Sequence, residues 1–298
     1  MSWAARALSV CLLGLAAVGL AQSPLALREA SWLAPEGRLE ALASEPDVSR
    51  AKLHQAALAS DLRDQFTSPM ALRDALLTGE ALFKAPLLLG GQAAKAGLSC
   101  HSCHVNGRGN PHFQHAAISG APGTADTTHS FFSKTLGNQI ADPKPIPDLM
   151  QPGKVDHARA SGQLEAFITM IVVEEFSGAK SAQEAIGPLA AYVRALRLLD
   201  AAPEPAMRPR SLRRDLENTR LAATEAGMRQ EAGETALAAL LLSSVQSQLQ
   251  TIHERLLPGA HENERQWVID RSREAGALRQ ILAKGRTPSP ARFTRWQK

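Results

Sequence analysis

The chain has 298 residues with a formal net charge of +4, and aromatic residues make up 4% of it. This length suffices for one large domain or two ordinary ones with a hydrophobic core. Abundant alanine and leucine with few aromatic residues favour helices packed through small and medium side chains. No basic run is interleaved with aromatic residues, so we expect no nucleic-acid partner.

The N-terminus is typical of an export signal. Arg6 precedes Ala7–Leu20, a run of 14 small and apolar residues that is short for a membrane span. Small residues then lead up to Ala21. We therefore expect residues 1–21 to be cleaved as a signal peptide, and we expect the mature protein to lie in the periplasm without membrane association.

Helical spacing of apolar residues begins after the signal. It extends over residues 35–64 with a break near Pro46, and a clearer helix covers residues 71–84 and ends at Pro86. Glycines and prolines then crowd residues 87–151. This composition predicts a long loop that wraps a cofactor instead of packing on itself.

The loop-rich stretch contains a cysteine motif. Cys100 and Cys103 are followed directly by His104. This spacing lets two thiols add across the two vinyl groups of one haem while the histidine reaches the iron, so the sequence predicts one haem c with His104 as the proximal ligand. Two other interpretations are a redox dithiol, which would need a βαβ context, and a zinc site completed by His112 or His115.

Five further helices are predicted after the loop. A proline-rich boundary at residues 201–209 separates the first two from the last three. The basic tail after Gly285 is expected to be frayed. The predicted helices cover residues 161–176, 182–199, 211–233, 234–257 and 262–284.

Sequences on both sides of the motif resemble a known family. The stretches Gly79–Phe83 and Gly97–Arg108 look like the cytochrome domains of bacterial di-haem cytochrome c peroxidases and their relatives in methylamine utilisation. The helix containing Tyr192 is similar to the last helix of that fold. The resemblance covers about residues 70–200, and it implies that the helix with Gly79 crosses the helix with Tyr192 at close range.

One departure from the family limits what the resemblance implies. The di-haem peroxidases have two haem motifs in one chain, whereas this sequence has a single one. A mechanism in which one haem feeds electrons to another therefore does not transfer intact.

These observations predict a mainly α protein with a cytochrome c-like haem domain and a helical C-terminal extension. The extension could pack against the haem domain, form a separate bundle, or provide a surface for a partner. The expected divisions are a signal peptide at 1–21, an N-terminal helical segment at 22–69, the haem-binding domain at 70–202 and the extension at 203–298.

The sixth ligand of the iron decides between functions, because two protein ligands favour electron transfer and an open position permits chemistry on small molecules. Met150, in a proline-stiffened loop, is the leading candidate, with Met170 or His157 as alternatives. The other histidines within reach are His112, His115 and His129.

Three charged residues near these candidates have simpler interpretations. Arg108 either pairs with a haem propionate or is a solvated loop residue. Glu174 and Glu175 are adjacent, so they would point to different sides of a helix and would not form an acid–base pair. We expect both on a solvated edge, with a helix cap near Gly178.

The sequence as a whole predicts one-electron transfer through the covalent haem, with a redox partner protein. Two alternatives remain open. One is a peroxidase-like haem enzyme with an open distal site, and the other is a haem-based sensor or interaction subunit.

Overall fold

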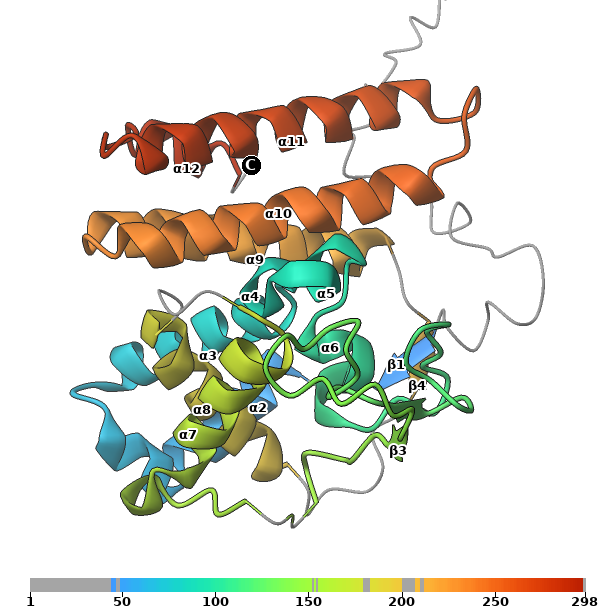
Figure 1. The fold of residues 1–298 in the computed structure, drawn as a ribbon. Helices are drawn as coiled ribbons and strands as arrows, with labels where there is room; N and C mark the ends of the chain where they lie inside the picture. The colour runs from blue at the N-terminus through green and yellow to red at the C-terminus, as the bar shows by residue number, and fades with distance from the viewer. Residues whose placement is uncertain are drawn as a thin grey trace, which may run out of the picture.

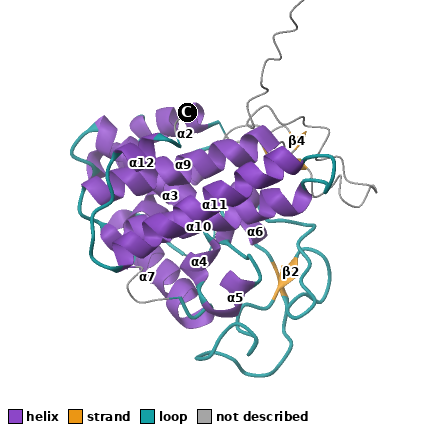
Figure 2. Cartoon of the chain, turned by 90° about the horizontal axis from the view of Figure 1, so that it is seen from above, coloured by secondary structure: helices purple, strands orange, loops and turns teal. Residues whose placement is uncertain are grey.

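The computed structural model describes residues 44–46, 49–151, 153, 155–178, 183–199, 207–209 and 212–296. The expected signal peptide and most of the segment before Arg50 lie outside the described residues. Within the described residues the protein is mainly helical, which confirms the prediction of a mainly α protein (Figure 2). None of the described helices contains a stretch that is both long and apolar enough to cross a membrane.

The helices predicted from residue 71 onward are present with ends shifted by a few residues, although the one predicted at 161–176 is divided between α7 and η6. Of the helical segment predicted at 35–64, residues 35–43 lie outside the described residues, and the described part forms β1, α2 and η3. The elements in chain order are β1 Ser44–Pro46, α2 Arg50–Leu58, η3 Asp61–Gln65, α3 Pro69–Phe83, α4 Pro86–Leu89, α5 Gly91–Lys95, α6 Cys100–Cys103, η4 Val105–Gly107, β2 Thr124–Ala125, β3 Lys144–Pro145, η5 Arg159–Ser161, α7 Gln163–Met170, the π-helix η6 Ile171–Glu175, α8 Gln183–Arg197, β4 Met207–Pro209, α9 Leu212–Glu231, α10 Thr235–Arg255, α11 Glu262–Ala283 and α12 Ala291–Thr294.

The helices form layers, as Figure 1 shows. One half of the molecule contains α2, α3, α7, α8 and the long loop with the cysteine motif. Helices α9 and α10 pack on this half through α3 and α4, and α11 packs on the far side of α10. Of the arrangements left open for the C-terminal helices, the structure has the one in which they pack against the preceding half.

Two small antiparallel sheets tie distant segments together. Strand β1 pairs with β4, so Ser44 lies opposite Pro209. Strand β2 pairs with β3, so Thr124 lies opposite Pro145. The second pairing closes the long loop on itself and returns the chain to the cysteine motif.

Helices α3 and α8 cross at Gly79. A Cβ at this position would lie 2.2 Å from the Pro188 carbonyl oxygen and 2.6 Å from Tyr192 Cβ, so only glycine fits. The rings of Phe83 and Tyr192 pack beside the crossing with centroids 5.4 Å apart. The close crossing implied by the resemblance is thus confirmed.

Gly79→Ala should destabilise the protein by about 2 kcal/mol or more, because the added methyl group meets a backbone carbonyl that cannot rotate away. The measurement is the free energy of unfolding in urea. Gly187→Ala is the matched control, since nothing lies within 4 Å of a Cβ there. This change in α8 should be neutral or stabilise by about 0.5 kcal/mol. Equal effects of the two substitutions would contradict the crossing.

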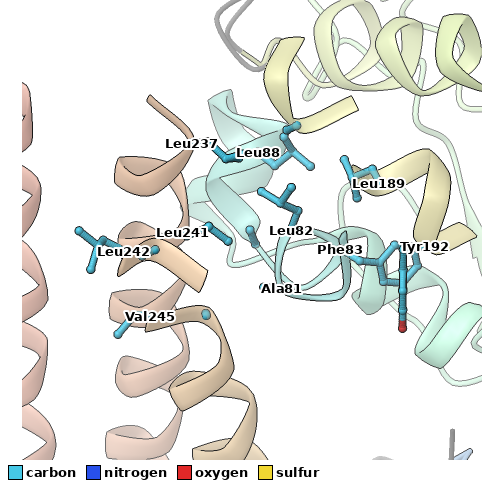
Figure 3. Close-up of a cluster of buried hydrophobic side chains, with 14 of the residues drawn as sticks. Ala81, Leu82, Phe83, Leu88, Leu189, Tyr192, Leu237, Leu241, Leu242 and Val245 are labelled. Carbon is cyan, nitrogen blue, oxygen red and sulfur yellow. The ribbon is translucent and has the colours of Figure 1, made fainter. Parts of the chain in front are cut away.

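The C-terminal helices share one apolar core with the motif half. Figure 3 shows Leu237 and Leu241 of α10 approaching Leu88 of α4 and Leu82 of α3, and all four side chains are buried. A buried hydrogen bond reinforces this interface, because Thr78 Oγ1 donates to Glu225 Oε2 over 2.9 Å. Burial raises the pKa of Glu225, although the bond from Thr78 acts in the opposite direction.

A charged cluster joins α2, α3 and α9. Glu80 accepts two hydrogen bonds from Arg50, at 2.6 and 2.8 Å, and one from Lys84 at 2.9 Å. Asn218 Oδ1 accepts from the same two cations. Burial alone would raise the pKa of Glu80, but Lys84 and Arg50 outweigh it and lower the pKa to about 2.

This cluster predicts a loss of stability in acid. A carboxyl group with a lowered pKa stabilises the folded state above its unfolded pKa near 4.5, and that contribution disappears as the pH falls toward about 2. The contribution is on the order of 3 kcal/mol. Glu80→Gln should therefore lower the unfolding free energy at pH 7 and flatten its pH dependence between pH 5 and about 2. An unchanged pH profile would contradict the assignment.

The basic tail is ordered where the structure describes it, so the prediction of a frayed end is wrong there. Phe293 and Trp296 are buried, and Phe293 packs against Gly227 of α9. The guanidinium of Arg271 lies 5.6 Å from the Trp267 ring centroid and 5.8 Å from that of Trp296. Two apolar side chains therefore hold the tail on the helices beneath it.

Candidate functional site

The cysteine motif forms a short helix. Ser99 and Ser102 make a capping box at the start of α6, and the His104 amide donates to the Cys100 carbonyl over 2.8 Å at its end. Residues three apart on a helix share a face, so the thiols of Cys100 and Cys103 lie on the same side. Both thiols are free and half-buried.

The thiols are poor nucleophiles in this environment. Burial raises the pKa of Cys100 to about 12. Burial, together with the neighbouring Cys100, raises the pKa of Cys103 to about 12. A dithiol that exchanges disulfides needs a thiolate with a lowered pKa, so this environment disfavours the redox-dithiol interpretation.

The ring of His104 is oriented by a backbone carbonyl. Its Nδ1 lies 3.0 Å from the Pro147 carbonyl oxygen. A carbonyl can only accept, so Nδ1 carries the proton and Nε2 keeps its lone pair. Burial lowers the pKa of His104 to about 4, against the opposing influence of Pro147 and Asp148. The ring is therefore neutral at pH 7, with Nε2 available to a metal.

Two contacts fix the loop that supplies this carbonyl. The Leu149 amide donates to the Gly107 carbonyl over 2.9 Å. Arg108 Nη1 donates to Asp148 Oδ2 over 2.8 Å, and the Arg108 side chain is 17% exposed. The prediction of a solvated Arg108 is therefore wrong, because this arginine holds the loop through Asp148. The alternative contact with a propionate stays a prediction.

Three other histidines have the opposite arrangement. The Nδ1 atoms of His101, His115 and His129 lie 3.1–3.3 Å from backbone amides that can only donate. Each Nδ1 therefore accepts, and the proton of the neutral ring sits on Nε2. His112 is exposed, and His157 is half-buried with its carbonyl accepting from Arg194 Nε over 2.6 Å.

The zinc interpretation finds no assembled ligand set among the described residues. No group of three or more His, Cys, Asp or Glu side chains there is placed to hold a metal ion. His115 instead packs its ring against the rings of Phe131 and Phe132, which also contact each other.

The two candidate methionines lie in different environments. Met150 is 2% exposed and packs near Gly107, beside the motif. Met170 is half-buried and is the last residue of α7. Neither position by itself assigns a ligand, so the sixth ligand stays a prediction.

The two adjacent glutamates differ, which corrects the prediction of a solvated edge. Glu174 is exposed, but Glu175 is buried on the same helix face as Leu164 and Val172. Burial raises the pKa of Glu175, and the nearby Asp126 raises it further, although a hydrogen bond with Thr127 lowers it.

Known proteins give no further guidance. The chain matches no protein-family model, no curated protein and no solved structure. Function must therefore be inferred from the residues of the site.

Asp148→Ala should lower the unfolding free energy by about 1–3 kcal/mol, because it removes the carboxylate that accepts from Arg108 and the Oδ1 that accepts from the Met150 amide. Thermal unfolding checks this effect. Asp142→Ala is the control, since its ion pair with Lys144 is exposed and should be worth about 0.5 kcal/mol or less. Equal losses from the two variants would show that Asp148 does not hold the loop.

Proposed function

We propose that the protein is an exported c-type cytochrome that holds one covalently attached haem and transfers single electrons. The observation that carries this proposal is the arrangement of His104, whose Nδ1 faces the Pro147 carbonyl and whose Nε2 is free, directly after Cys100 and Cys103. Iron-ligating histidines characteristically donate a hydrogen bond from their other ring N–H to an acceptor such as a backbone carbonyl.

The donor set fits a haem. Two thiols on one face of a single helical turn suit the two vinyl groups of one macrocycle, and the following imidazole suits its iron. Three apolar side chains near the motif are only partly buried, although they pack against the core. Leu98 precedes the motif, the Leu149 amide donates to Gly107, and the Ile146 carbonyl lies beside Gly109. Such side chains suit contact with an apolar ring.

A haem bound here would supply the Fe(III)/Fe(II) couple. The Pro147 carbonyl holds the His104 imidazole in one tautomer and one orientation. Burial keeps this imidazole neutral, so no proton has to leave before it donates its lone pair. The loop contacts of Gly107 and Arg108 keep the carbonyl in place.

Further features support a cytochrome c-like domain in the periplasm. The crossing of α3 and α8 at Gly79 agrees with the helix pair implied by the family resemblance. The export signal expected at residues 1–21 would deliver the chain to the compartment where haem is attached to such motifs. An electron-transfer protein also needs a redox partner, which we expect to be another protein.

The first test is expression in a host with a haem-attachment system, followed by a denaturing gel stained for haem. The wild-type chain should retain haem after denaturation, and Cys100→Ser with Cys103→Ser should lose it, because thioether bonds survive unfolding. His101→Gln is a control inside the motif and should keep the haem. A wild-type chain that acquires only zinc, or no cofactor, would refute the proposal.

The second test is the visible spectrum of the loaded protein with and without carbon monoxide. Electron transfer predicts a low-spin spectrum that carbon monoxide leaves unchanged. A high-spin ferric spectrum or ready carbon monoxide binding would contradict electron transfer and favour a peroxidase-like enzyme or a sensor.

A further inference from the structure

The two axial ligands of a haem iron lie on opposite faces of the macrocycle. A residue held on the same side as His104 therefore cannot be the sixth ligand, and this bears on Met150. The free Nε2 of His104 points toward the iron in the proposed function, on which this inference rests. Nδ1 is on the other side of the ring and faces Pro147. The chain around Pro147 therefore lies behind the imidazole, on the proximal side.

Met150 is held to this proximal chain by its own backbone. It follows Pro147 by three residues, and its amide donates to Asp148 Oδ1 over 2.8 Å, which tightens the turn. The preceding Leu149 amide donates to the Gly107 carbonyl. Gly107 in turn donates its amide to the His104 carbonyl over 3.0 Å, so the turn is bonded to the segment that carries the ligand.

The side chain of Met150 also packs against the segment that follows His104. A Cβ at Gly107 would lie 3.4 Å from Met150 Cγ and 2.9 Å from Leu196 Cδ1. Met150 and Leu196 of α8 thus both pack on Gly107, which has a φ of +87°. With 2% of its surface exposed, Met150 fills the space between the motif and α8.

We infer that Met150 is a positioning residue on the proximal side of the haem and does not ligate the iron. Its side chain packs against Gly107 and near Leu196, and this packing holds the turn of residues 147–150 in place. This packing keeps the Pro147 carbonyl at hydrogen-bonding distance from His104 Nδ1. The sequence prediction of Met150 as the sixth ligand would require the sulfur to reach the opposite face of the macrocycle.

The test compares two substitutions of Met150 in the haem-loaded protein. Met150→Leu fills a similar volume without a thioether. The ferric spectrum, the response to carbon monoxide and the midpoint potential of this variant should therefore match those of the wild type. Met150→Ala loosens the turn and should weaken the Pro147 bond. The imidazole then becomes a weaker donor, so the midpoint potential should rise and the His104 Nδ1 proton should exchange faster, with the spin state unchanged.

Met70→Leu is the matched control, because Met70 is exposed at the start of α3. It should leave all of these measurements at their wild-type values. Loss of a methionine-dependent ferric band at about 695 nm, or a change to high spin, in Met150→Leu would identify Met150 as a ligand and overturn the inference. A Met150→Ala variant that is less stable but keeps the wild-type midpoint potential and Nδ1 proton exchange would show that Met150 only packs in the core. That result would also overturn the inference. A wild-type chain without covalent haem would instead refute the proposed function.

Discussion

The hydrogen bond between His104 and Pro147 is the interaction on which the site depends. It joins residues 43 positions apart, and it determines which ring nitrogen carries the proton. Much of the long loop serves this contact, because the pairing of β2 with β3 and the Arg108–Asp148 ion pair both return the chain to the motif. A loop rich in glycine and proline has little regular structure of its own, so its conformation is set by such individual bonds.

The parts of the fold that follow from periodicity could be predicted from the sequence. Residues 71–84 have a buried apolar face and a terminating proline, and the structure has α3 there from Pro69 to Phe83. Ser68 caps this helix by accepting from the Ala71 amide, a local signal that needs no tertiary information. The Gly79 crossing was accessible only through the family resemblance, because periodicity does not reveal which helix a glycine meets.

The details of the site depend on contacts between distant residues, and these could not be predicted from local patterns. The sequence presents nine histidines. The partner of each Nδ1, a carbonyl for His104 and an amide for His115, is known only once the loop is folded. Arg108 finds Asp148 forty residues away, and Glu175 is buried although the adjacent Glu174 is exposed. These corrections concern side chains whose environment is determined by tertiary structure.

The interface between α3 and α9 can form only late in synthesis of the chain. Thr78 and Glu225, which meet across it, are separated by 147 positions. The chain emerges from its N-terminus, so Cys100 and Cys103 are synthesised well before the helices that complete the core around α3. Contacts of such long range also form slowly. The cysteine motif is therefore present in the growing chain before the interface between α3 and α9 can form.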